Sequence, residues 1–460
     1  MTKGTTMRVR VESGELEGIV EDGVAAFLGV PYAAGPTGRS RFLPPTLPPR
    51  WAGVRPATRF GPTAPQPGSL RARMVLGQSG PSGPDYLVLN VWTPQSDRRA
   101  NLPVLVWIHG GAFTNGSGDV PALRGATLAK DTETVVVTVN YRLGPLGFAS
   151  HPELTGDHAN LGLLDQRAAL DWVGRNITAF GGDPSRVTLA GDSAGAMSAA
   201  IQSVLPGADT PIAALSLHSG VPRLTEPDSA ADVVQRLAAQ LDVSVRQLAE
   251  LDDSTLIAAA SAIAPTHRFG PVAAGELADG LPAPSAIPTR LNTTSDEGTF
   301  FVLDERSPRR LTSTEAEDLA AAMLPGDGHR RYKAAALSLP TARADDPHWA
   351  LSAAVTSALF EEPADAWAGA APNRVWRTRY SRPAPLWDGW LGATHTLDVP
   401  VLFGNHRHPE LARLYAGDEG IDEVSIRLRR DFRAFLYGHP PTTERPDEDH
   451  SEPVKSAETA

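Results

Sequence analysis

An apolar run that ends in a Gly-x-Ser-x-Gly pattern restricts the fold of this chain more than any other feature. Val187 to Ala190 form the run, Gly191-Asp192-Ser193-Ala194-Gly195 follow it, and a segment of small residues comes next. We predict a strand that turns sharply into a helix, with Ser193 at the apex. Such a turn strains the backbone of the serine, and glycine at 191 and 195 removes the Cβ atoms that would clash there. The alternative is an ordinary glycine-rich turn between a strand and a helix.

Composition excludes several classes of chemistry. The chain has 460 residues, a formal net charge of −11 and no cysteine, so disulfides, thiolate chemistry and cysteine-ligated metals are excluded. The excess of acidic side chains argues against nucleic acid or an anionic membrane as the main partner. The first residues lack the apolar core of a signal peptide, and no apolar run approaches the ~18 residues of a membrane-spanning helix. We therefore expect a cytoplasmic protein that binds neither nucleic acid nor membranes.

Apolar runs alternate with helix-like segments along the first half of the chain. The runs 103–109 and 134–140 are apolar on both faces, which is typical of buried strands in a parallel sheet. Residues 162–176 have the apolar spacing of a helix. Shorter strand-like runs lie at 9–11, 16–20, 24–30 and 88–92. The alternation predicts a doubly wound α/β fold, with a mostly parallel central sheet and helices on both faces.

Two later regions have a different character. Residues 222–290 and 306–370 are rich in Ala and Leu, with charged residues at helical spacing. We interpret both regions as insertions that form a helical cap over the sheet, within a single domain of residues 1–438. Residues 439–460 are polar, charged and without periodicity, so we predict a disordered tail.

A serine hydroxyl that attacks a carbonyl needs a base, an acid that orients the base, and N–H donors for the developing oxyanion. In folds with this turn, the chain order is serine, acid, histidine. His395 lies on a turn before an apolar run, far downstream of Ser193. We therefore predict His395 as the base. His406 and His408 follow that apolar run, and we interpret them as exposed loop residues.

Two neighbouring acids, Asp296 and Glu297, lie between Ser193 and His395 in the chain. The order serine, acid, histidine fits both, and the residue types alone do not separate them. Either acid is also suited to cap the N-terminus of a helix. We therefore expect one of the two to face the histidine and the other to act as a cap.

Small residues follow the predicted strand 103–109. The segment His109–Phe113 contains two glycines, which let N–H groups approach a substrate oxygen, and the N–H of Ala194 is the other expected donor. His109 comes too early in the chain to be the base. His218 ends another strand-like run, so we expect it to pack near the site. A phosphate-binding loop is the alternative, but the lysine and the glycine spacing of such loops are missing.

Several segments together resemble one family, the type B carboxylesterases, which include bacterial para-nitrobenzyl esterases and the cholinesterases. The resemblance runs from Val9 to Phe435, and residues 180–195 fit the family's active-site serine signature at every defined position. The other matching blocks are Phe27–Ala33, Leu89–Pro94, His109–Phe113, Asn140–Gly144 and Asn160–Gln166.

This resemblance implies an α/β-hydrolase fold and a carboxylic ester hydrolase with a catalytic triad. It implies Ser193 as the nucleophile, Glu297 as the acid and His395 as the base. The implied donors of the oxyanion hole are the N–H groups of Gly111, Ala112 and Ala194. It implies no metal and no organic cofactor, and the expected partner is a small-molecule ester.

The chain departs from the family pattern at some positions. Pro84 stands where the family often has a glutamate that pairs with the arginine matching Arg41. Residues 64–85 contain no tryptophan, so we expect no cation–π platform for choline. Ser357 replaces an acidic residue of the family. These departures leave the three implied triad positions intact.

The same residues suit other reactions besides ester hydrolysis. Thioesterase, carbamate or amide hydrolase, and acyl-transfer or lactonising activities all use a serine, a histidine and an acid in this way. A non-catalytic binding protein of cholinesterase-like fold is a further alternative. Such proteins usually lack one triad residue, whereas this chain has all three positions filled.

Overall fold

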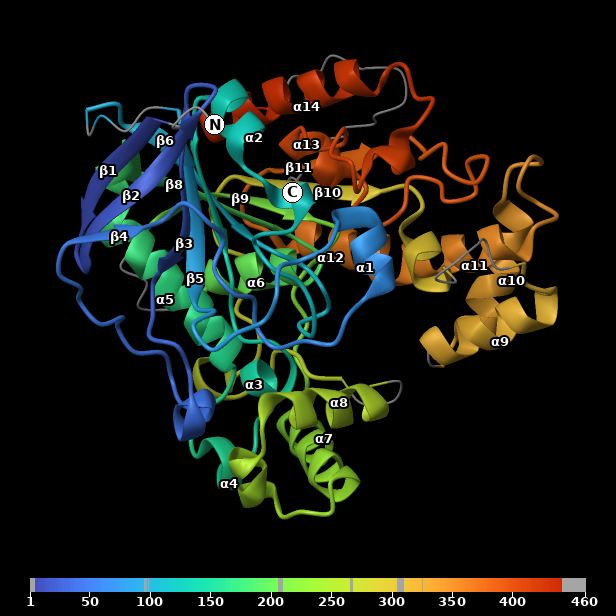
Figure 1. Ribbon diagram of the computed structural model, residues 1–460. Coiled ribbons are helices and arrows are strands. Elements are labelled where there is room, and N and C mark those ends of the chain that lie inside the picture. Colours follow the sequence, from blue (N-terminus) through green and yellow to red (C-terminus); the bar gives the residue numbers. More distant parts are fainter. Residues whose placement is uncertain are drawn as a thin grey trace, which may run out of the picture.

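The computed structural model describes residues 5–94, 97, 99–205, 210–264, 268–303, 310–324 and 326–440. Within these ranges the strands form one eleven-stranded sheet in the order β1-β2-β3-β5-β7-β6-β8-β9-β10-β11, with β4 paired to β2 (Figure 1). The strands are β1 (Thr5–Val11), β2 (Gly14–Glu21), β3 (Val24–Pro31), β4 (Val54–Pro56), β5 (Val88–Thr93), β6 (Leu102–Ile108), β7 (Val135–Val139), β8 (Gly182–Asp192), β9 (Ile212–His218), β10 (Thr289–Thr294) and β11 (Val375–Tyr380). Most of the predicted tail, residues 441–460, lies outside the described residues.

The sheet has an antiparallel edge and a parallel centre. Strands β1, β2, β3, β5 and β7 pair antiparallel in succession. From β7 through β6, β8, β9 and β10 to β11, every pair is parallel. The carboxyl ends of the parallel strands therefore meet at one edge, where ligand sites of open α/β sheets form. The predicted mostly parallel sheet is confirmed.

Strand β6 shows why the apolar run 103–109 is continuous. Val104, Val106 and Ile108 pack into the core on one face of the sheet. Leu105 and Trp107 pack into a second core on the other face. Both faces are covered by helices, which buries each side chain of the run. The covering helices are α5 (Leu161–Asn176) and α6 (Ala194–Gln202) on the first face, and α2 (Ala126–Thr132), α13 (Asp398–Phe403) and α14 (Ile421–Leu436) on the second.

The two regions interpreted as a cap are helical. In Figure 1 the helices of the first lie at the bottom of the molecule, and those of the second extend to the right. The first contains α7 (Pro227–Gln240) and α8 (Asp253–Ile263), and the second contains α9 (Ser313–Met323), α10 (Gly328–Ser338), α11 (Pro347–Thr356), η7 (Ser357–Glu361) and α12 (Glu362–Ala370). The remaining α-helices among the described residues are α1 (Leu70–Leu76), α3 (Gly144–Phe148) and α4 (Pro152–Thr155).

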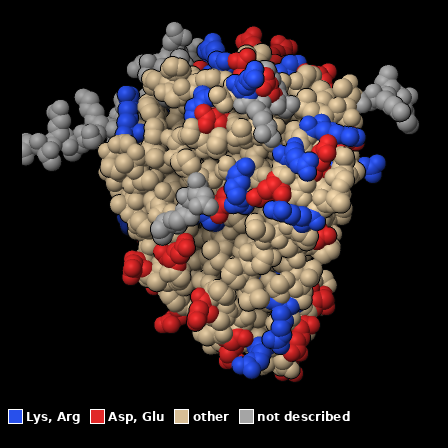
Figure 2. All heavy atoms as spheres, turned by 90° about the vertical axis from the view of Figure 1, so that its left-hand side faces the viewer, with Lys and Arg blue, Asp and Glu red and all other residues tan. Residues whose placement is uncertain are grey.

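Charged side chains are mixed on the face that carries the antiparallel edge. Figure 2 shows this face, with blue and red side chains interspersed over a mainly uncharged surface. On this face the acidic excess of the chain is spread out among basic residues. The face therefore presents no continuous basic stripe of the kind that tracks a nucleic acid.

Candidate active site

Ser193 lies at the turn between β8 and α6. Its φ of 53° and ψ of −120° place its backbone in a sparsely populated conformation. The turn is held by the Ser193 N–H, which donates to the carbonyl of His218 at 2.7 Å. The Ser193 side chain is half-buried. The predicted strand–turn–helix is present, and it leaves the serine within reach of a ligand.

Glycine is required on both sides of Ser193 because strand β6 runs against the turn. A Cβ on Gly195 would overlap the carbonyl oxygen of Ile108 and lie 2.8 Å from that of His109. A Cβ on Gly191 would lie 2.5 Å from the Ile108 oxygen. These distances are shorter than side chains tolerate, which confirms the role predicted for the two glycines.

Glu297 and His395 form a buried pair. The distance between Glu297 Oε2 and His395 Nδ1 is 2.5 Å, and neither side chain is more than 3% exposed. The second carboxylate oxygen accepts hydrogen bonds from Ser219 Oγ at 2.5 Å and from the Thr294 N–H at 2.7 Å. Because the carboxylate accepts the Nδ1 hydrogen, Nε2 keeps a free lone pair and the negative charge balances an imidazolium. The pair therefore supplies an oriented base.

Asp296 has a different role from its neighbour Glu297. Its Oδ2 accepts the Ala393 N–H at 2.9 Å, and its Oδ1 binds the Arg343 guanidinium at 2.6 Å. It stands before η6 (Glu297–Val302), but its side chain makes no capping hydrogen bond. The expected helix cap is therefore wrong, because the carboxylate is held by Ala393 and Arg343 instead. Of the two acids, Glu297 contacts His395, and Asp296 ties the loop before His395 to Arg343 of the second helical region.

The end of β9 connects Ser193 with the Glu297–His395 pair. His218 accepts the Ser193 N–H, and Ser219, the next residue, donates to Glu297. The hydrogen bonds within the described ranges include none between Ser193 Oγ and His395. The end of β9 thus contacts both Ser193 and Glu297, and Glu297 is hydrogen-bonded directly to His395.

Asp192 is a residue that sequence patterns do not single out, because the motif leaves its position free. Its Oδ1 accepts the Trp107 Nε1 hydrogen at 3.2 Å and the Gly110 N–H at 3.1 Å. Burial raises the pKa of Asp192, and the nearby His395 opposes that rise. Asp192 therefore fastens the start of the loop after β6 to the serine turn.

His218 and Asp398 form a second buried histidine–carboxylate pair, in addition to His395 and Glu297. His218 Nδ1 is 2.6 Å from Asp398 Oδ2, and Ser216 Oγ is 3.1 Å from His218 Nε2. Asp398 begins α13, three residues after His395, while His218 holds the backbone of Ser193. The pair ties the loop of the base to the strand that supports the serine. The expectation that His218 packs near the site is confirmed.

The loop after β6 has a left-handed backbone at three successive residues. The φ angles are 113° at Gly111, 53° at Ala112 and 60° at Phe113, and the loop closes through the Asn115 N–H, which donates to the Gly111 carbonyl at 2.9 Å. Among the described residues, the N–H groups of Gly111, Ala112 and Ala194 have no hydrogen-bond acceptor. Unpaired N–H donors at a helix start and in a tight loop are suited to an anionic oxygen.

The two histidines after α13 lie apart from the serine turn. His406 is only 4% exposed, and its Nε2 is 2.7 Å from Asp422 Oδ1. The expectation of an exposed residue is wrong for His406, because the first turn of α14 brings Asp422 onto it. His408 is half-buried.

Three phenylalanine rings surround His395. The ring centroids of Phe300, Phe301 and Phe360 lie 5.5, 5.5 and 4.9 Å from that of His395. Phe360 belongs to η7, in the second cap region. His395 therefore has an apolar surrounding to which the second helical region contributes.

Arg41 keeps an acidic partner although Pro84 replaces the usual one. Its guanidinium forms a salt bridge with Asp253, at the start of α8. It also donates to the carbonyls of Leu251 at 2.7 Å and Ala249 at 3.0 Å. The arginine thus anchors the first cap region.

The described residues contain neither a membrane-spanning helix nor a cluster of metal ligands. None of the helices described is long and apolar enough to cross a bilayer. Within the same ranges, no three His, Asp or Glu side chains are grouped so that they could hold a metal ion.

Sequence comparisons identify relatives of this chain. The profile of the Carboxylesterase family matches residues 5–456. The para-nitrobenzyl esterase of Bacillus subtilis (strain 168) is 34% identical, over 95% of this chain and 91% of that protein. The phenmedipham hydrolase of Pseudarthrobacter oxydans is 34% identical, over 85% of this chain and 82% of that protein. The fumonisin B1 esterase of Sphingopyxis macrogoltabida is 37% identical, over 92% of this chain and 79% of that protein.

Solved structures show the same fold. A PNB esterase superimposes with a TM-score of 0.81 at 31% identity, covering 96% of this chain and 93% of the other. A carboxylesterase of Geobacillus stearothermophilus, at pH 6.2, superimposes with a TM-score of 0.82 at 32% identity, covering 96% and 92%. The sheet and its helices are thus an α/β-hydrolase fold, as predicted. With a profile match over nearly its whole length, this chain belongs to the carboxylesterase family and is a carboxylic ester hydrolase.

Proposed function

We propose that Ser193, His395 and Glu297 are the nucleophile, base and acid of this hydrolase, which works through an acyl-enzyme. One observation carries the proposal: the buried 2.5 Å contact between Glu297 Oε2 and His395 Nδ1. It orients a base in the region where the strained turn presents Ser193. A serine hydroxyl alone is a poor nucleophile, and an oriented histidine is what it lacks.

The reaction has two halves. His395 Nε2 takes the hydroxyl proton as Ser193 Oγ attacks the ester carbonyl carbon, which forms a tetrahedral intermediate. The C–O bond then breaks, the alcohol leaves with the proton from His395, and the acyl group stays on Ser193. Water attacks this acyl-enzyme, gives its proton to His395, and the carboxylic acid leaves as the proton returns to Ser193. Glu297 accepts the Nδ1 hydrogen throughout and stabilises the imidazolium.

The proposed oxyanion hole consists of the N–H groups of Gly111, Ala112 and Ala194. Their lack of acceptors among the described residues supports this role. Ala194 is the first residue of α6, whose positive helix end adds to the stabilisation. Each such donor contributes about 3 kcal/mol to the stability of the transition state.

We place the two helical insertions over the site, as the cap of a single domain of residues 1–438. Two contacts support this placement for the second insertion. Arg343 of the second insertion binds Asp296, and Phe360 of the same insertion packs against His395. Substrate that reaches His395 therefore meets side chains of the cap.

Replacement of the nucleophile tests the proposal. Ser193→Ala should lower kcat for para-nitrophenyl acetate by about 10⁵-fold or more, because no other hydroxyl replaces it in the turn. Ser198→Ala, on the same helix and away from the turn, is the matched control and should keep its activity. Circular dichroism of both variants reports the fold. Normal turnover by a folded Ser193→Ala protein would disprove the assignment.

The same residues serve other acyl substrates, so the substrate class needs its own measurement. Values of kcat/KM for an ester, a thioester, a carbamate and an amide with one common acyl group separate the alternatives. We expect the ester to be the best substrate. A higher kcat/KM for the thioester, or acyl transfer to an added alcohol that outpaces hydrolysis, would reassign the reaction on the same triad.

A further inference from the structure

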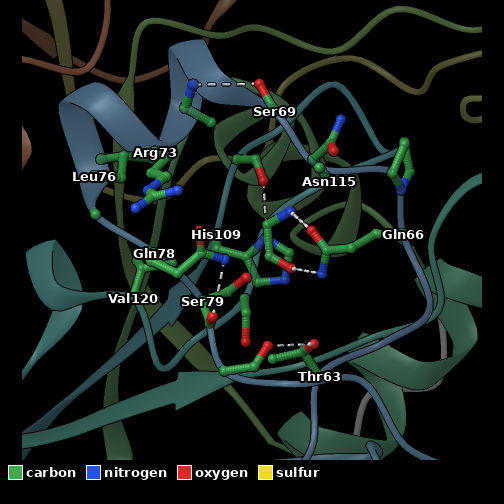
Figure 3. A pocket seen from close by; sticks show the side chains of 18 of the residues that line it. Thr63, Gln66, Ser69, Arg73, Leu76, Gln78, Ser79, His109, Asn115 and Val120 are labelled. Atoms are coloured by element: carbon green, nitrogen blue, oxygen red, sulfur yellow. Dashed lines mark hydrogen bonds between the residues drawn. The ribbon is translucent and has the colours of Figure 1, made fainter.

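A cavity of about 480 Å³ lies between α1 and the loop after β6 (Figure 3). One wall consists of His109, Gly110 and residues 115–117 of the loop. The other wall consists of α1 and the segments on either side of it, including Gln66, Arg73 and Gln78. Figure 3 shows polar side chains from both walls directed toward the same space.

The cavity adjoins the serine turn through Gly110. The Gly110 N–H donates to Asp192 Oδ1 at 3.1 Å. A Cβ on Gly110 would lie 2.7 Å from the carbonyl oxygen of Asp192, so the two backbones are in contact. Asp192 immediately precedes Ser193. This wall of the cavity is therefore joined to the serine turn through Asp192.

The lining has a positive charge and no carboxylate. Arg73 is the lining cation, and its guanidinium has no ion-pair or hydrogen-bond partner within the part of the chain that the structure describes. Glu410 and Asp119 lie behind the lining, where they accept the N–H groups of Gln78 and Gly80, both at 2.8 Å. Burial raises the pKa of Asp119, which weakens its negative charge. An unpaired guanidinium matches the geometry of a carboxylate, which it binds with two parallel hydrogen bonds.

Two buried acceptors complete the lining. His109 Nε2 and Asn115 Oδ1 have no hydrogen-bond partner among the described residues, and His109 is only 3% exposed. His109 Nδ1 is 2.8 Å from the Gly110 carbonyl, so its hydrogen is used there and Nε2 carries a bare lone pair. Burial lowers the pKa of His109 to about 4, so the ring is neutral at pH 7. A buried polar atom without a partner costs free energy that a ligand with an O–H donor recovers.

We propose that this cavity is a subsite for an ester substrate that carries a free carboxylate next to a hydroxyl group. Arg73 binds the carboxylate, and Asn115 Oδ1 accepts the single hydrogen of the hydroxyl. The inference rests on the proposed function, since the rest of the same substrate reacts at Ser193. The carboxylate belongs either to the acyl half, as in a monoester of a dicarboxylic acid, or to the alcohol half, as in an ester of a hydroxy acid.

Paired substrates test the subsite. The acyl arm compares the mono-para-nitrophenyl ester of glutaric acid with para-nitrophenyl pentanoate, and the alcohol arm compares 4-(butanoyloxy)benzoate with its methyl ester. In the arm whose carboxylate reaches Arg73, Arg73→Gln should lower the ratio of kcat/KM for the charged ester to kcat/KM for the neutral ester by about tenfold or more. Arg246→Gln is the matched control, because Arg246 is also exposed and lies on η4 (Val245–Glu250) in the first cap region. It should leave the ratio unchanged.

The outcomes separate the subsite from the proposed function. A ratio that Arg73→Gln leaves unchanged in both arms, or an equal loss for charged and neutral esters, would overturn the subsite. Failure of the wild-type protein to hydrolyse either neutral ester would overturn the proposed function instead. The hydroxyl contact is tested with the 3-hydroxyglutarate monoester: Asn115→Ala should lower its kcat/KM relative to the glutarate monoester about fivefold. An unchanged ratio there would overturn the hydroxyl contact.

Discussion

His395 and His109 are both buried histidines near Ser193, and they differ in the partner of Nδ1. In His395 the partner is the Glu297 carboxylate at 2.5 Å, and in His109 it is the Gly110 carbonyl at 2.8 Å. Burial lowers the pKa of His109 to about 4, and the carbonyl offsets only part of that effect. A carboxylate, in contrast, carries the charge that balances an imidazolium. The partner on Nδ1, rather than burial, therefore distinguishes a base from a neutral acceptor.

The largest expected effect comes from removal of the charge on the partner of His395. Glu297→Gln should lower kcat for para-nitrophenyl acetate by about 10³- to 10⁴-fold, because the ring loses both its fixed tautomer and the balancing charge. Asp296→Asn is the matched control, since it changes the neighbouring acid in the same way. It breaks the contact with half-exposed Arg343, which contributes about 1 kcal/mol. Steady-state kinetics with equal losses in both variants would refute the difference between the two acids.

The next effect concerns the contact between the serine turn and the strand before His109. Gly195→Ala places a Cβ over the Ile108 carbonyl oxygen, so the free energy of unfolding should fall by about 3 kcal/mol. Gly369→Ala, in helix α12, has no atom within 4 Å of the added Cβ and should stabilise the protein by up to about 1 kcal/mol. Chemical denaturation measures both. A Gly195→Ala protein as stable as the wild type would show that the turn accommodates a Cβ at residue 195.

The smallest effect is the pH dependence that His109 gives to stability. The unfolded histidine binds a proton below its usual pKa of 6.5, whereas the folded ring stays neutral down to about 4. The unfolded state therefore gains protons first, and this contribution to stability is lost as the pH falls. Between pH 6.5 and 5 the loss is about 2 kcal/mol.

His109→Gln should reduce this slope of unfolding free energy against pH. His329→Gln, which changes an exposed histidine, should keep the slope of the wild type. Urea denaturation at several pH values measures all three proteins. An identical slope in His109→Gln and wild type would show that His109 takes up its proton over the same pH range in the folded and unfolded states.

Local patterns suffice for the parts of the site that lie close together in the chain. The two-sided apolar runs 103–109 and 134–140 are the parallel neighbours β6 and β7, and the glycines around Ser193 mark the strained turn. Each of these features depends on a few consecutive residues, whose periodicity and side-chain size are visible in the sequence. The family resemblance also placed Glu297 opposite His395.

Contacts between distant segments were not predictable from residue types. The choice between Asp296 and Glu297 depends on the bridge that aligns Asp296 with Thr394. His406 is buried because the first turn of α14 brings Asp422 onto it. The cavity beside Gly110 exists because α1 folds against the loop after β6. Each depends on how separate elements pack, which no local periodicity encodes.

Covalent labelling with a fluorophosphonate, followed by peptide mass spectrometry, tests the central claim most directly. The reagent forms a stable adduct with a serine that an oriented histidine activates. We expect one adduct per chain, on Ser193, which is absent in Ser193→Ala and forms more slowly in Glu297→Gln. An adduct on another residue would contradict the assignment of Ser193 as the nucleophile. So would a folded protein that takes up no label, which would instead indicate a binding protein that retains the fold without the reaction.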